Sequence, residues 1–263
     1  MTMRSDARCW LLVVVFAIGM AFVESATVYD LRVMVDRIDP YQANPLPMRE
    51  AVGNVELARE AATLVMLFAV GAIAGRTWQT RLGYTAIAFG VWDILYYVFL
   101  KVLCGWPHSL LDWDILFLVP LPWWGPVLAP LLISLLMIIW GTLAGLEQTA
   151  GAGRTTETLV WLISLVGVIL ALRVFMQETL VAAKNGAAAV RHVLPLQFNW
   201  SWFCLALGLM CAPAALAVTR FFSKRPVDLG PLSSLDHSGP VSVESTLSVM
   251  AQTAVTSRRT LER

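Results

Sequence analysis

The apolar stretch from Leu82 to Lys101 is long enough to cross a lipid bilayer, yet it carries Asp93 near its middle. A membrane-spanning helix needs about 20 predominantly apolar residues. A charge at the centre of such a helix costs about 2.5–3.5 kcal/mol on insertion scales, so it faces the interior of a helix bundle and its polar partners. The stretch therefore predicts a membrane helix beside a buried polar site.

The composition agrees with a membrane protein. Of the 263 residues 58% are hydrophobic and 14% are charged, whereas soluble domains have about 25% charged residues. The net charge of +1 provides no basic surface for nucleic acid. We predict a protein integral to a cell membrane, the inner or plasma membrane if the source is bacterial. Its surroundings are the lipid bilayer, and other membrane subunits are candidate partners.

Six apolar stretches have the length of membrane spans, which predicts an all-α, polytopic fold. We place them at about 10–30, 56–75, 82–101, 126–146, 158–177 and 198–219. They form a six-helix domain over residues 1–220, with a loop at 31–55. Residues 221–263 have too little apolar content to fold alone, so we expect a disordered cytoplasmic tail.

Leu111–Val119 is too short to cross and is followed by Pro120, Pro122 and Pro126, so we predict a re-entrant or interfacial segment between the third and fourth spans. The first apolar core resembles the central part of a signal peptide. However, Glu24 stands where a cleavage site requires a small residue, so we expect the first helix to be retained.

Ionisable and phenolic side chains gather at similar depth in four of the predicted spans. Counting 1.5 Å per helical residue places them in the outer half of the bundle. Glu56 and Glu60 are four residues apart and share a helix face. The predicted polar cluster consists of Glu24, Glu56, Arg59, Glu60, Asp93, Tyr96, Tyr97, Lys101 and Arg173. His108, Asp112 and Asp114 belong to the outer connection and are candidate outer-side ligands.

Three interpretations of this cluster remain open: an ion-pair network that fixes helix packing, a proton or cation site, and a pocket for an organic substrate or lipid. Carboxylates suit a hard divalent cation, with Glu24, Glu60 and Asp93 as candidate ligands. The predicted spans contain no histidine, which argues against bis-histidine haem, and there is no Walker A nucleotide-binding loop. Asp93 with Tyr96 and Tyr97 could form a proton relay, or a tyrosine could simply hydrogen bond to the buried acid.

Two classes of function follow. In the first, the protein is a membrane enzyme, or an ion- or proton-coupled carrier, with an acidic site. In the second, it is a non-catalytic subunit or scaffold whose buried ion pairs only specify helix packing. The sequence therefore leaves open whether the protein is an enzyme. Gly71 and Gly141 each lie four residues before another glycine, a spacing typical of close helix contacts.

The distribution of Lys and Arg near the span ends predicts cytoplasmic N- and C-termini. Single cysteines introduced at Ser109 and Ser233 of a cysteine-free protein test this orientation. We expect an impermeant thiol reagent to label residue 109 in intact cells and to reach residue 233 only after lysis. Labelling of residue 233 from outside would reverse the topology.

Overall fold

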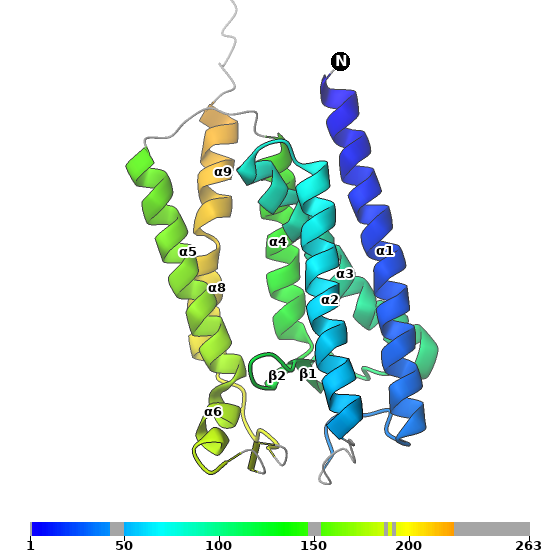
Figure 1. Ribbon diagram of the computed structural model, residues 1–263. Coiled ribbons are helices and arrows are strands. Elements are labelled where there is room, and N and C mark those ends of the chain that lie inside the picture. The colour runs from blue at the N-terminus through cyan, green and yellow to red at the C-terminus, as the bar shows by residue number, and fades with distance from the viewer. Residues whose placement is uncertain (1, 43–49, 147–153, 187–188, 191–192, 224–263) are drawn as a thin grey trace, which may run out of the picture. The chain divides into compact units, whose positions relative to one another are not determined.

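A computed structural model describes residues 2–42, 50–146, 154–186, 189–190 and 193–223, and most of this chain is helical (Figure 1). Within it, five apolar stretches are helical and long enough to cross a membrane. They lie in α1 (Thr2–Met34), α2 (Glu50–Ala74), α3 (Trp78–Cys104), α5 (Arg154–Phe175) and the consecutive pair α8 (Trp200–Met210) and α9 (Ala212–Ser223). These helices have the length and composition of an integral membrane protein.

The fourth predicted span differs from the other five. It corresponds to α4 (Leu128–Leu146), whose apolar part, Leu128–Ala144, is shorter than the other spans. A short helix, α6 (Gln177–Ala183), follows α5. The structure thus supports five spans and one shorter apolar helix, and a sixth span stays a proposal.

The predicted loop at 31–55 is too long at both ends. Helix α1 continues to Met34 and α2 begins at Glu50, because hydrophobic and helix-forming residues extend beyond the apolar cores from which we set the limits. This brings Arg32 into a helix. At the other end of the chain, α9 reaches Ser223, and the predicted tail from residue 224 onward lies outside the described residues.

The segment between α3 and α4 is a β-hairpin, so an all-α fold is wrong at this point. Strands β1 (Trp113–Phe117) and β2 (Trp123–Pro126) pair antiparallel, with an irregularity in register between Ile115 and Phe117. The prolines around β2 lack the N–H that a helix requires, and aromatic and β-branched residues favour strands. Figure 1 shows the hairpin near the ends of the helices where α2 and α4 begin.

Helix α3 packs against α1, α2 and α4, whereas α5 packs against α8 and α9, and α4 also contacts α9. In Figure 1, α4 accordingly lies between these two groups of helices. Buried aromatic rings of Phe175 and Phe203 hold α5 to α8, with centroids 5.8 Å apart. The polar residues of α1, α2 and α3 therefore lie in one group of helices.

Glycines allow α3 to approach its neighbours closely, as their spacing predicted. A methyl group at Gly141 of α4 would lie 2.4 Å from the Gly83 carbonyl oxygen of α3, and one at Gly71 of α2 would lie 2.5 Å from the Thr85 backbone nitrogen. Such distances leave no space for a side chain, so these glycines set the separation between helices. A methyl group at Gly90 of α3 would likewise lie 2.5 Å from the Ser134 carbonyl oxygen of α4. The prediction of close helix contacts at Gly71 and Gly141 is confirmed.

Replacing Gly141 by Ala should force α3 and α4 apart and lower the free energy of unfolding by about 1–3 kcal/mol, as overpacking does. Thermal unfolding in detergent measures the effect. Gly208→Ala in α8 is the matched control, because a methyl group there meets nothing within 4 Å. An unchanged melting temperature for Gly141→Ala would contradict the close contact.

Candidate functional site

A cavity of about 180 Å³ lies between α1, α2, α3 and the hairpin. Its wall contains the carboxylates of Glu24, Glu56, Glu60, Asp93 and Asp114 and the guanidinium groups of Arg32 and Arg59. Aromatic side chains, among them Trp92, Tyr96, Tyr97 and Phe117, complete it. Within the described lining, carboxylates outnumber guanidinium groups by three.

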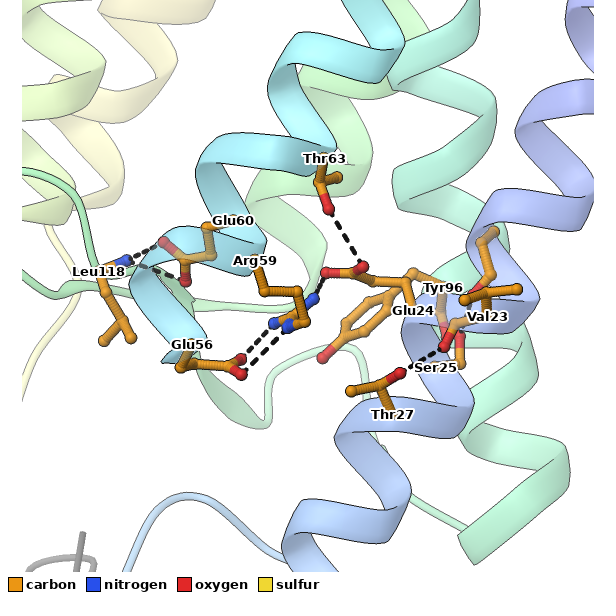
Figure 2. A network of polar contacts seen from close by, with 11 residues as sticks. Val23, Glu24, Ser25, Thr27, Glu56, Arg59, Glu60, Thr63, Tyr96 and Leu118 are labelled. Carbon is orange, nitrogen blue, oxygen red and sulfur yellow. Dashed lines mark hydrogen bonds and ion pairs between the residues drawn. The ribbon is translucent and has the colours of Figure 1, made fainter. Parts of the chain in front are cut away.

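Arg59 of α2 connects two acids from different helices (Figure 2). Its Nη1 forms an ion pair with Glu24 of α1, and its Nε and Nη2 bind both carboxylate oxygens of Glu56, with Nε 3.0 Å from Oε2. Glu56 precedes Arg59 by three residues, one helical turn, so this pair forms within α2. The hydroxyl of Thr63 donates a second hydrogen bond to Glu24, at 3.2 Å. Arg59 is thus fully engaged by the two acids.

Glu60 has a different partner although it lines the same cavity as Glu56. Both of its oxygens accept the backbone N–H of Leu118, at 3.2 and 2.9 Å. Leu118 follows β1 directly, and Figure 2 shows Glu60 pointing toward it and away from Arg59. The carboxylate therefore attaches the hairpin to α2 through a neutral donor and forms no ion pair within the described part of the chain.

Asp93 is almost completely buried, with 7% of its surface exposed. The hydroxyl of Ser134 in α4 donates a hydrogen bond of 2.8 Å to its Oδ2. The close approach of α3 and α4 at Gly90 makes this contact possible. The donor to Asp93 is therefore a serine and not one of the tyrosines considered from the sequence. The Tyr96 phenol instead points toward the pair of Arg59 and Glu56 (Figure 2).

Arg32 and Asp114 form the second buried ion pair at the cavity. Arg32 Nη2 lies 3.1 Å from Asp114 Oδ1, Nη1 donates to the Ile38 carbonyl oxygen, and the guanidinium carbon lies 4.1 Å from the Trp106 ring centroid. Burial raises the pKa of the Asp114 carboxyl to about 6, although the Arg32 guanidinium, the Ile115 N–H and the Tyr97 hydroxyl each lower it. The pair joins the end of α1 to the hairpin.

Arg32 was not predicted as a site residue because residues 31–55 were assigned to a loop, whereas α1 continues to Met34. One signal was present: Arg32 follows Glu24 by eight residues, a little over two helical turns, in a segment with no proline or glycine between them. Extending the helix would have placed both side chains on the same half of its surface. The partner Ser134 carried no comparable signal, since a lone serine in an apolar helix is common.

Four other predicted residues lie outside the cavity. Lys101 is exposed and donates to the carbonyl oxygens of Gly105 and Pro107, both at 2.8 Å, and Arg173 and His108 are also exposed. Asp112 accepts the backbone N–H groups of His108 and Ser109 and so closes a turn. Lys101 and Arg173 were predicted in the cluster because their depth in the sequence matched, but depth does not determine the direction in which a side chain points.

The carboxylates do not assemble into a metal site. Among the described residues, no group of three His, Cys, Asp or Glu side chains is placed to hold a metal ion. Glu24, Glu60 and Asp93, the three predicted ligands, each bind a separate partner: Arg59 and Thr63, Leu118, and Ser134. The expectation of a divalent cation held by these three residues is therefore not supported.

Comparison with known proteins adds no family. The sequence matches no protein-family model and no curated protein, and the fold matches no solved structure. The assignment of function rests on the geometry of the cavity.

Replacing Arg59 by Gln should destabilise the protein strongly, because it leaves the buried Glu24 and the half-buried Glu56 without their counter-charge. Removing one partner of a buried ion pair costs about 3–5 kcal/mol. Arg173→Gln is the matched control, since Arg173 is an exposed arginine of α5 outside the cavity. Thermal unfolding of both variants in detergent measures the difference. Equal melting temperatures would contradict a stabilising role of the Arg59 ion pairs.

Proposed function

We propose that the protein is an integral membrane protein that binds protons or a small monovalent cation in the cavity between α1, α2, α3 and the hairpin. The observation that carries this proposal is the composition of the cavity wall, in which five carboxylates face two guanidinium groups. Such a site would serve a membrane enzyme or an ion- or proton-coupled carrier.

The physical reason is the cost of unpaired charge inside a membrane. Ionisable groups at membrane depth pair with one another or mark ion and proton pathways. Arg59 and Arg32 form ion pairs with three of the five carboxylates. Among the described residues the other two carboxylates accept hydrogen bonds only from neutral groups, the Ser134 hydroxyl at Asp93 and the Leu118 N–H at Glu60. These acids need a proton or a cation to remain in a buried site.

Asp93 is the residue most available for this role. Its hydrogen bond comes from the Ser134 hydroxyl, which can also accept a hydrogen bond from a protonated carboxyl or turn toward another partner. Glu60, in contrast, holds the hairpin through both oxygens. A substitution that removes the charge of Asp93 therefore leaves the connections between α1, α2 and the hairpin in place.

A scaffold role is the second candidate, and the same contacts favour it. Arg59 joins α1 to α2, Glu60 joins α2 to the hairpin, and the Arg32–Asp114 pair joins the hairpin to α1. A non-catalytic subunit of a membrane complex could use these bonds only to fix its packing. In that role the surplus acids would carry protons permanently and would bind no added cation.

The same proposal includes six spans with cytoplasmic termini. Helix α4 has 19 residues, about 28 Å at 1.5 Å per residue, which approaches the hydrocarbon thickness of about 30 Å. Its contacts with both α3 and α9 favour a position inside the bundle. The hairpin would then enter from the outer side as a re-entrant segment.

Asp93→Asn tests the cation or proton site, because it removes the charge and keeps an oxygen that can accept from Ser134. Ligands that bind only the folded protein raise its melting temperature. We expect sodium ions, or a shift to lower pH, to stabilise wild-type protein in detergent and to have a much smaller effect on Asp93→Asn.

Glu157→Gln provides the control. Glu157 is paired with Arg220 at 3.1 Å, outside the cavity, so its replacement also removes one carboxylate but should keep the wild-type response to pH and sodium. If Asp93→Asn responds to both as wild type does, the site is not at Asp93 and the scaffold role is favoured.

A further inference from the structure

The cavity is aromatic as well as acidic. Trp92, Tyr96 and Tyr97 of α3 and Phe117 of the hairpin all line it. Their rings form a continuous series, with centroid distances of 6.3 Å for Trp92–Tyr96, 5.1 Å for Tyr96–Tyr97 and 6.4 Å for Trp92–Phe117. The face of an aromatic ring attracts a cation, and the attraction is stronger where water is excluded.

Besides Arg59 Nη1, which is ion-paired with Glu24, two buried side-chain atoms of residues that line the cavity have no hydrogen-bond partner in the described part of the chain. They are the indole Nε1 of Trp92, a donor, and the Oδ2 of Asp114, an acceptor. Trp92 is 5% exposed and Asp114 is 2% exposed. A buried polar atom without a partner is unfavourable, so both atoms favour an occupant that accepts from one and carries positive charge toward the other.

The guanidinium groups offer little to an anion. Arg59 is held by Glu24 and Glu56, and Arg32 is held by Asp114 and by the Ile38 carbonyl oxygen. The carboxylate of Asp93, by contrast, has only a hydroxyl partner among the described residues. The polarity left for a ligand is therefore negative, with one N–H donor at Trp92.

We infer that the cavity binds a small organic cation, an ammonium group that also carries an oxygen atom. The ammonium group lies against the aromatic rings and the carboxylates of Asp93 and Asp114, and the oxygen accepts the Trp92 Nε1–H. This inference rests on the proposed cation site and names its ligand class. The volume of about 180 Å³ corresponds to about six water molecules at about 30 Å³ each, which suits a cation of the size of choline or ethanolamine.

The same ammonium chemistry occurs in free amines and in phospholipid headgroups, so the test separates these sources. Choline and ethanolamine are added to the detergent-purified full chain, and binding is followed by the melting temperature and by tryptophan fluorescence. The uncharged 3,3-dimethyl-1-butanol is the control for choline, because it has the same shape without the charge. Choline titrations are then repeated in nanodiscs of phosphatidylcholine and of phosphatidylglycerol.

We expect choline or ethanolamine to raise the melting temperature and the uncharged alcohol to have no effect. Asp93→Asn should raise the dissociation constant of choline at least about tenfold, which equals 1.4 kcal/mol of binding free energy. Trp92→Phe removes the N–H donor but keeps an aromatic ring, and it should raise the dissociation constant of choline about fivefold. Trp140→Phe is its matched control, because Trp140 lies outside this cavity, against Trp161.

Weaker choline binding in phosphatidylcholine than in phosphatidylglycerol nanodiscs would support the inference with a lipid headgroup as occupant, and equal binding would support a free amine. Equal binding of the uncharged alcohol, or unchanged affinity in Trp92→Phe, would overturn it. If protons or sodium act through Asp93 and no organic cation binds, the inference fails and the proposed function stands. If none of these ligands acts through Asp93, both fail.

Discussion

The pairing of Arg59 with Glu24 and Glu56 is the interaction on which the described cavity depends. In an apolar bundle these three charges are largely withdrawn from solvent, with at most 21% of each side chain exposed, so each depends on the others. The pair within α2 needs only the helical repeat, whereas the pair with Glu24 requires α1 to lie beside it. The Thr63 hydroxyl adds a second contact from α2 to the same acid. The position of α1 relative to α2 is thus set by polar contacts in addition to apolar packing.

The hairpin closes the cavity because two further polar contacts attach it. Glu60 of α2 accepts the Leu118 N–H, and Arg32 of α1 pairs with Asp114. A short antiparallel pair of strands is only marginally stable by itself, so these contacts and the packing of its aromatic side chains hold it in place. The residues that fix the hairpin are the same residues that give the cavity its charge. The packing contacts and the proposed binding site therefore use the same residues, so the contacts fit both a scaffold and a binding site.

Apolar packing determines the direction from which Asp93 receives its hydrogen bond. Gly90 of α3 lies against the Ser134 backbone, and Gly83 lies against Gly141. A larger residue at these positions would separate α3 from α4 and withdraw the Ser134 hydroxyl. The environment of Asp93 is consequently set by small residues that have no polar function themselves.

The sequence alone determined the properties that depend on local patterns. Apolar length and low charge gave a membrane protein, the glycine spacing indicated close helix contacts, and the residues of α2 placed Glu56, Arg59 and Glu60 together, because three or four residues make one helical turn. What it could not determine was the partner of each side chain across helices. It placed Lys101 and Arg173 in the cluster from their depth, assigned Arg32 to a loop, and gave no indication of Ser134.

Only the tertiary structure decided those pairings, because they depend on helix rotation and on the hairpin, both of which are set by contacts between residues far apart in the sequence. Arg32 and Asp114 are 82 residues apart, Asp93 and Ser134 are 41 apart, and Glu60 and Leu118 are 58 apart. A periodic pattern shows which face of a helix is polar, but it does not show which neighbour that face will meet. The type of protein was therefore predictable from composition and periodicity, and the arrangement of the cavity followed from the packing of α1, α2, α3, α4 and the hairpin.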